Sequence, residues 1–338
     1  MKLRHSVAAI ALIAACGIAR ADDKPTVDLT KTTVPDVDKL PDDEHGALVR
    51  YGRDLVVRTD AFIGPEVANP AMRFTGTNMT CQNCHLGAGT APYAAPLTGV
   101  SAVYPQFMPR FDAIYSVSDR VNACMQRSMA GTALPLESRE MKAFVAYIDF
   151  LSEGIPKGAD RIGSMLKAFK EPARPVDLAH GETVFKETCA VCHGEDGLGK
   201  RRGSVGDARG YEFPPLWGPD ASSEGASSFR LLTVMQFVSS NMPLGVTWQK
   251  PQLTVDEAYD VAAFLVSHPK QPRKGPQLND FPHPLDKPVD FPFGPYADHF
   301  TEAQHKYGPY GPIREEVAAL KAAAAAAKAG VGTAPAAK

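Results

Sequence analysis

Cys81-Gln82-Asn83-Cys84-His85 is the stretch of this sequence that decides the fold. Two cysteines separated by two residues and followed at once by histidine form the attachment signature of a c-type haem. The thiols of Cys81 and Cys84 are expected to add to the two vinyl groups of the porphyrin, which leaves His85 as the proximal iron ligand. Because the width of the porphyrin sets this spacing, the motif predicts a covalently bound haem c.

A second copy of the motif, Cys189-Ala190-Val191-Cys192-His193, lies further along the chain. Cysteine pairs of this spacing also occur in redox and zinc sites, but two complete copies in one chain disfavour that alternative. We therefore predict two covalently bound haem c groups. Cys189 and Cys192 attach the second haem, and His193 is its proximal ligand.

The chain is long enough for two domains of ordinary size, and each haem supplies much of the apolar core of its own domain. The predicted organisation is a signal peptide at 1–21, a first cytochrome c domain at 22–152, a linker at 153–178, a second cytochrome c domain at 179–268, and a wrapping extension with a low-complexity tail at 269–338.

The two halves repeat the same order of elements. Apolar residues at helical spacing predict helices at 42–58 and 137–151, and a capping box at 254–257 begins the closing helix of the second half. Pro-Leu-x-Gly loops at 96–99 and 215–218 follow the two motifs, and a backbone carbonyl of each loop is expected to accept the Nδ1 proton of the proximal histidine. The fold class is mainly α: two class I cytochrome c-like domains in tandem, with a Pro-rich C-terminal extension.

The N-terminus has the features of an exported protein. Basic residues at positions 2 and 4 precede an apolar run at 7–15, and residues 19–21 are typical of a cleavage site. Bacterial c-type haems are attached outside the cytoplasm, so the periplasm is the expected localisation. Lipid anchoring through Cys16 is the minority alternative.

Charge and composition narrow the range of partners. The chain has 36 Lys and Arg against 38 Asp and Glu, and residues 1–21 contain three basic residues and no acidic one, so the mature charge is −5. No nucleic-acid partner is expected from this balance. The Ala-rich tail around 322–327 is predicted to be frayed or disordered.

The sixth iron ligand of each haem determines its potential and reactivity. In the second half Met242 lies 49 residues after His193 and shortly before the closing helix. A thioether there favours reduced iron, which suits a haem from which electrons leave. Met235 is the competing ligand, but it lies within an apolar run and is expected to belong to the core.

The first half has Cys124 in the corresponding place, 39 residues after His85. The alternative is a buried structural thiol, with Met125 or Met129 on the iron. Its position and the oxidising compartment favour Cys124 as the thiolate ligand.

Polar residues near Cys124 indicate an anion site. Arg110 and Arg120 precede the cysteine, and Ser128 follows it. Guanidinium groups offer fixed pairs of donors that suit oxyanions, although most arginines only make a surface soluble. The combination predicts a small, doubly charged sulfur oxyanion as substrate.

With these motifs in place, the sequence resembles the periplasmic dihaem thiosulfate dehydrogenases, over residues 40–270 and into the extension. The resemblance implies oxidative coupling of two thiosulfates to tetrathionate, with reversal in some members, and electron transfer to a soluble or membrane-attached acceptor cytochrome. It also implies His85/Cys124 and His193/Met242 ligation, substrate binding by Arg110, Arg120 and Ser128, and catalysis at Cys124. A monomer is expected.

One residue departs from the family pattern. Some members have lysine directly before the distal methionine and exchange ligands between redox states, whereas this chain has Asn241. No lysine exchange is therefore expected, and the preferred direction stays open. Two alternative functions also remain: a non-catalytic dihaem electron carrier, and a haem subunit of a multi-enzyme thiosulfate-oxidising complex.

Overall fold

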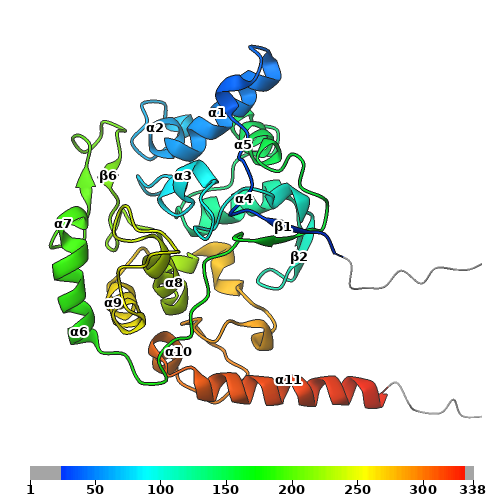
Figure 1. Cartoon of the computed structure of the whole chain (residues 1–338), viewed down its shortest axis with the longest axis vertical. Coiled ribbons are helices and arrows are strands. Elements are labelled where there is room, and N and C mark those ends of the chain that lie inside the picture. Colours follow the sequence, from blue (N-terminus) through cyan, green and yellow to red (C-terminus); the bar gives the residue numbers. More distant parts are fainter. Residues whose placement is uncertain (1–23, 332–338) are drawn as a thin grey trace, which may run out of the picture.

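The computed structural model describes residues 24–331 of the chain. The predicted signal at 1–21 and the alternative anchor Cys16 lie outside the described residues, as do the last residues of the tail. Within 24–331, no helix has both the length and the apolar character needed to cross a membrane. Figure 1 shows the first half of the chain above the second, with the C-terminal extension beneath the second half.

The first half is built mainly of helices. The described part of the chain begins near β1, which pairs in parallel with β4, so this strand is attached to the linker between the halves. The predicted helices at 42–58 and 137–151 are confirmed as α1 and α5, each about two residues shorter at its start. The elements are β1 (Thr26–Asp28), α1 (Glu44–Val57), α2 (Thr59–Ile63), α3 (Leu86–Gly89), β2 (Gln106–Met108), β3 (Ala113–Tyr115), α4 (Val117–Arg127), α5 (Arg139–Phe150) and β4 (Asp160–Ile162).

Helices α1 and α5 cross at a glycine. A Cβ atom on Gly52 would lie 2.0 Å from the carbonyl oxygen of Ala143 and 2.7 Å from the Cβ of Tyr147, so only glycine lets the two backbones approach this closely. Apolar side chains from both helices and from α4 form the core on either side of this crossing. Its buried members include Val49, Leu55, Ile63, Met125, Leu134, Met141, Phe144 and Leu151.

The second half repeats this plan. The predicted capping box is confirmed: Thr254 accepts a hydrogen bond from the backbone of Glu257, whose side chain accepts one from the backbone of Thr254. Helix α6 leads through a wider turn at Phe185–Cys189 into the short α7 that carries the second motif. The elements are α6 (Leu178–Val184), α7 (Ala190–His193), β5 (Lys200–Arg201), β6 (Tyr211–Phe213), α8 (Leu231–Asn241) and α9 (Val255–Ser267).

A glycine again allows the first and closing helices to cross. A Cβ atom on Gly181 in α6 would lie 2.1 Å from the carbonyl oxygen of Asp260 in α9. The repeated glycine shows that the two halves share their packing as well as their element order. The core beside this crossing includes Val184, Phe185, Leu231, Met235, Tyr259, Val261, Leu265 and Val266.

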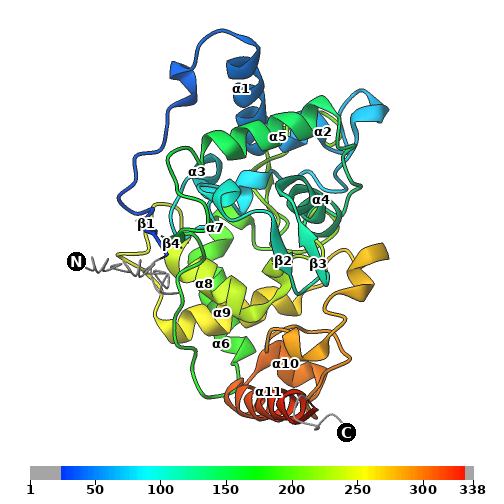
Figure 2. The ribbon, with the colours of Figure 1, turned by 90° about the vertical axis from the view of Figure 1, so that its right-hand side faces the viewer.

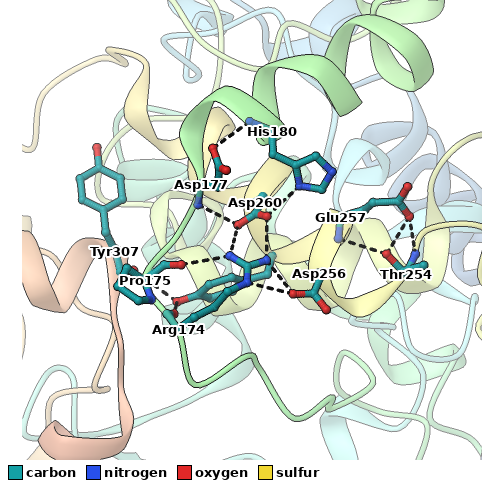
Figure 3. Close-up of polar contacts among 10 residues, drawn as sticks. Arg174, Pro175, Asp177, His180, Thr254, Asp256, Glu257, Asp260 and Tyr307 are labelled. Carbon is teal, nitrogen blue, oxygen red and sulfur yellow. Dashed lines mark hydrogen bonds and ion pairs between the residues drawn. The ribbon is translucent and has the colours of Figure 1, made fainter.

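A buried carboxylate attaches the linker to the second half (Figure 3). Asp260 accepts two hydrogen bonds of 2.8 Å from the guanidinium of Arg174, one from the backbone of Asp177 and one from the ring of His180. Burial alone would raise the pKa of Asp260, but the hydrogen bonds from Arg174 and His180 outweigh it and hold that pKa below its usual range. The carboxylate therefore stays ionised and fixes α6 against α9.

Ion pairs orient the two halves relative to each other. Arg201 of the second half makes two hydrogen bonds of 2.9 Å to Glu66 of the first, and another of 3.1 Å to Asp220. Asp220 in turn accepts a hydrogen bond of 2.7 Å from the backbone of Asn78. Glu66 and Asn78 precede the first haem motif, whereas Arg201 and Asp220 follow the second, so these contacts help to fix the position of one motif relative to the other.

The extension contacts α4 and the core of the second half, and its end differs from the prediction. Beyond α10 (Glu302–Tyr307), residues Gly311–Val331 form one long helix, α11, so the prediction of a frayed or disordered tail around 322–327 is wrong. Alanine has the highest intrinsic helix propensity, and Lys321 and Lys328 flank the run of alanines at 322–327. Only the first turns of α11 contact the core, through Ile313 and Val317. Figures 1 and 2 show the helix along the lower edge of the molecule.

The glycine crossings predict a stability defect. Gly52→Ala and Gly181→Ala should each lower the free energy of unfolding by about 1–3 kcal/mol, because the added methyl group pushes the paired helices apart. Denaturant unfolding of the haem-loaded protein measures this loss. Gly311→Ala is the matched control, since a Cβ at Gly311 meets nothing within 4 Å. Equal stability of all three variants would show that the crossings tolerate a side chain.

Candidate functional site

The first motif presents its histidine in one fixed orientation. His85 Nδ1 lies 2.5 Å from the carbonyl oxygen of Ala95, at the start of the predicted 96–99 loop, so Nδ1 carries the proton and donates to that oxygen. Nε2 is then the unprotonated nitrogen that is able to bind a metal. The turn before the histidine is fixed by Asn83, whose side chain accepts a 2.7 Å hydrogen bond from the backbone of Thr80. The predicted carbonyl acceptor is confirmed here.

The second motif has the same geometry. His193 Nδ1 lies 2.8 Å from the carbonyl oxygen of Pro214, directly before the predicted 215–218 loop. Burial lowers the pKa of His193, which favours the neutral imidazole that metals bind. The acceptor precedes the Pro-Leu pair in both halves, so the repeat extends to the hydrogen bond that orients each histidine.

The cysteines of both motifs form no disulfide within the described residues, so all four sulfur atoms can serve to attach haem. Burial raises the pKa of Cys81 to about 12 and that of Cys189 to about 11, so both stay protonated at neutral pH. The backbone of Cys81 donates a 3.0 Å hydrogen bond to the hydroxyl of Thr59, which places the thiol at the end of α1 and α2. Two reduced thiols beside an oriented, neutral histidine fit a covalently attached haem in each half.

Cys124 differs from these cysteines because it lies beside a cation. It is on α4, one helical turn after Arg120, and Arg120 Nη1 donates to Cys124 Sγ at 3.0 Å. Burial alone would raise the pKa of Cys124, but Arg120 and the His85 ring outweigh it and lower that pKa to about 6. A large fraction of Cys124 is therefore thiolate at neutral pH.

The structure brings Cys124 and the first motif together. The His85 ring is close enough to Cys124 to lower the pKa of its thiol, so the two side chains lie near each other. The alternative ligands Met125 and Met129 are 2 % and 6 % exposed and belong to the buried core, whereas Cys124 is only partly buried. Cys124 remains the predicted ligand opposite His85.

Met242 and the competing ligand Met235 differ in their burial. Met235 is 1 % exposed in the core of the second half, as expected, while Met242 ends α8 with an extended backbone and is only partly buried. Asn241 does not point toward a free site, because its amide donates 3.2 Å hydrogen bonds to the carbonyl oxygens of Tyr93 and Phe237. Met242 remains the predicted ligand of the second iron.

Arg110 lies in a buried cluster with a partner that the sequence analysis missed. Its Nε is 3.7 Å from Asp280 of the C-terminal extension, which also pairs with Arg127. Burial lowers the pKa of Arg110 to about 10, which still leaves the group charged at neutral pH. Arg120 is near enough to contribute to the lowered pKa of Arg110, so the two predicted anion-binding residues lie in one region.

Ser128 and Lys270 lie at the boundary between the first and second halves. Ser128 caps α4, and its carbonyl oxygen accepts a 3.2 Å hydrogen bond from the backbone of Ser223 in the second half. Lys270, which the sequence analysis did not single out, lies beside Cys84, and its Nζ donates a 3.2 Å hydrogen bond to Ser222. Burial lowers the pKa of Lys270 to about 8. A lone lysine after a closing helix carries no sequence signal for such a position.

Comparison with protein families matches both halves of the chain. A family model described as SoxA/TsdA, cytochrome c domain, matches residues 73–156, and a model described as cytochrome c matches residues 178–269. The two matched segments contain one haem motif each. Two tandem cytochrome c domains are therefore shown, as predicted.

Several characterised relatives resemble the chain over most of its length. A thiosulfate dehydrogenase of Stutzerimonas stutzeri is 36 % identical over 71 % of this chain and 73 % of its own length. One of Allochromatium vinosum is 36 % identical over 78 % of this chain and 92 % of its own length. A solved structure of a thiosulfate dehydrogenase (TsdBA) from Marichromatium purpuratum superposes with a TM-score of 0.63 and 30 % identity. The match covers 71 % of this chain and 49 % of that chain, so this chain spans about half of the other protein.

The position of Met242 predicts a spectroscopic effect. Met242→Gly should abolish the sulfur-to-iron charge-transfer band and lower the potential of the second haem by on the order of 0.1 V, since axial ligands tune haem potentials over roughly 0.8 V. Absorption spectroscopy with a redox titration measures both. Met235→Leu is the matched control and should keep the band. Loss of the band in Met235→Leu instead would transfer the ligand assignment to Met235.

Proposed function

Because this chain belongs to the thiosulfate dehydrogenase family, we propose that it couples two thiosulfate ions to tetrathionate and passes the two released electrons through two covalently bound haem c groups to an acceptor cytochrome. The observation that carries this proposal is Cys124, a partly buried thiol that lies near His85 and accepts a 3.0 Å hydrogen bond from Arg120. An electron carrier has no use for a thiol activated in this way.

The ligand sets divide the work between the two halves. His85 and Cys124 would hold the first haem, attached through Cys81 and Cys84. His193 and Met242 would hold the second, attached through Cys189 and Cys192. Each haem would supply one-electron redox capacity, so that the pair could accept both electrons of the reaction. The thiolate of Cys124 favours oxidised iron and the thioether of Met242 favours reduced iron, which suits the first site to substrate oxidation and the second to electron exit.

Cys124 takes part in bond formation. Its thiolate sulfur and the outer sulfur of the first thiosulfate form an S–S bond, and two electrons leave in this step. The outer sulfur of a second thiosulfate then attacks the outer sulfur of the adduct, which forms tetrathionate and returns the Cys124 thiolate. Atoms and charge balance, because two thiosulfate dianions become one tetrathionate dianion and two electrons. The low pKa of Cys124 keeps the nucleophile deprotonated for each cycle.

Arginine side chains make the encounter of two dianions possible. Arg120 is hydrogen-bonded to Cys124 and therefore lies at the reacting sulfur, while Arg110 provides a second positive charge in the same buried region. Fixed guanidinium groups offset the repulsion between the two substrates without reorganisation of solvent. The hydroxyl of Ser128, at the end of the same helix, contributes a hydrogen bond to a sulfonate oxygen.

The last part of the proposal concerns the compartment, the oligomeric state and the electron acceptor. We propose that the chain works in the periplasm as a monomer and delivers electrons to a soluble or membrane-attached cytochrome. Asn241 is held by backbone carbonyls and is no iron ligand, so the second haem keeps methionine in both redox states. The same residues allow the reverse reaction, tetrathionate reduction, when a reduced cytochrome is supplied.

Replacement of Cys124 tests the proposed function directly. Cys124→Gly and Cys124→Met should each lower thiosulfate oxidation by more than about 100-fold, because both lack the nucleophile, while both haems stay attached. Thiosulfate consumption with an artificial acceptor, together with tetrathionate formation, measures the loss. Near-normal turnover of both variants would show that Cys124 is a structural thiol and that the chain serves as an electron carrier.

Replacement of either arginine should lower the rate of thiosulfate oxidation. Arg110→Ala and Arg120→Ala should each lower kcat/KM for thiosulfate by about 30- to 1000-fold, which corresponds to about 2–4 kcal/mol for one charged donor in a partly desolvated site. Arg139→Ala is the matched control, since Arg139 is exposed and packs over the Tyr51 ring on the same domain. Two alanine variants with the kinetics of the control would show that Arg110 and Arg120 do not bind the substrate.

A further inference from the structure

The C-terminal extension joins the two elements that carry the predicted anion-binding residues. Arg110 lies in the turn of the β2–β3 hairpin, and its carbonyl oxygen accepts a 2.9 Å hydrogen bond from the backbone of Phe281. The buried side chain of Gln277 donates a 2.6 Å hydrogen bond to the carbonyl oxygen of Gln126 on α4. Residues 277–281 therefore hold the hairpin turn and the end of α4 against each other.

Asp280 lies between two arginines of these elements and contacts them unequally. Its carboxylate has no exposed surface and pairs with both Nε and Nη2 of Arg127. Toward Arg110 it makes one 3.7 Å approach to Nε and no hydrogen bond. Among the hydrogen bonds of the described residues, Arg110 donates none from its guanidinium, so its terminal nitrogens remain available to a ligand.

Aromatic rings surround the guanidinium groups of Arg110 and Arg127 and strengthen their interactions with Asp280. The Arg110 guanidinium lies 5.1 Å from the centre of the Phe281 ring and 5.7 Å from that of Phe291, and Arg127 lies 4.4 Å from that of Phe111. Aromatic walls exclude water, and charge interactions are stronger where water is excluded. Asp280 is the carboxylate that pairs with Arg110 and Arg127, and Arg120 and Arg230 add positive charge nearby, so loss of the Asp280 charge alters the field at the anion site.

We propose that Asp280 is a positioning residue of the anion site: it holds Arg127 back, leaves Arg110 to meet the substrate oxygens, and limits the positive charge that thiosulfate and tetrathionate experience. This inference rests on the proposed function. Two dianions enter the site, and one dianion must leave it after the two electrons have been removed. An additional positive charge would bind this product more tightly and slow its release. The extension thus completes the site that α4 and the hairpin begin.

A set of charge variants of the haem-loaded protein tests this inference, with sulfate as an unreactive dianion. Asp280→Asn adds one positive charge and should bind sulfate about tenfold more tightly. Arg127→Met removes one and frees Asp280 to pair with Arg110, so sulfate binding should weaken about tenfold. The double variant restores the original charge and should lie within about twofold of the wild type.

Calorimetric titration with sulfate measures these affinities without turnover, and steady-state assays provide a second readout. Asp280→Asn should lower KM for thiosulfate and lower kcat with it, the pattern of a site that retains anions. Asp286→Asn is the matched control, because it removes an exposed carboxylate of the same extension that makes no ion pair among the described residues; its sulfate affinity should equal that of the wild type. Asp280→Glu keeps the charge and should also bind sulfate normally.

The outcomes separate the two proposals. Unchanged or weaker sulfate binding by Asp280→Asn overturns the role of Asp280, as does an Asp286→Asn variant that binds sulfate as tightly as Asp280→Asn. If Asp280→Asn does not fold, Arg127→Met decides, and sulfate binding at or above the wild-type affinity overturns the proposal. A wild-type protein without thiosulfate oxidation refutes the proposed function, while the calorimetric series still judges Asp280.

Discussion

The hydrogen bond between Arg120 and Cys124 forms because the two residues are one turn apart on α4, and contacts from both halves and from the extension hold this helix in place. A thiol buried without a cation stays protonated, as the raised pKa values of Cys81 and Cys189 show. The guanidinium beside Cys124 reverses that effect of burial. Helix α4 packs on the first core through Met125, and Ser223 of the second half and Gln277 of the extension bind its C-terminal end.

The two halves show how one architecture supports two kinds of haem site. Both have a glycine at the crossing of the first and closing helices, and both orient the proximal histidine through a carbonyl directly before a Pro-Leu pair. They differ on the opposite side of the histidine. There the first half has a thiol with an arginine partner, and the second has Met242 at the end of α8 with no charged partner in the described contacts. The shared scaffold positions a cofactor, and the distal segment determines what each site does.

The parts of this account that were predictable from sequence are those in which the interacting residues are close in the chain or follow a strong local pattern. The attachment motifs, the loop carbonyls and the capping box at Thr254 are of this kind. Asp280 was not predictable, because it is 153 residues from Arg127 and belongs to a Pro-rich segment without helical periodicity. The tail was misjudged for a different reason: low complexity suggested disorder, whereas a run of alanines favours a helix even where little packs against it.

Electron paramagnetic resonance of the fully oxidised protein tests the central claim most directly, because it reports the ligands of ferric iron without turnover. The account predicts two low-spin signals of different character: one typical of histidine–thiolate ligation, which is absent from Cys124→Gly, and one typical of histidine–methionine ligation, which that variant keeps. A wild-type spectrum without the histidine–thiolate signal would contradict the account. Cys124 would then be no ligand of the first haem, and the activated thiol on α4 would need another explanation.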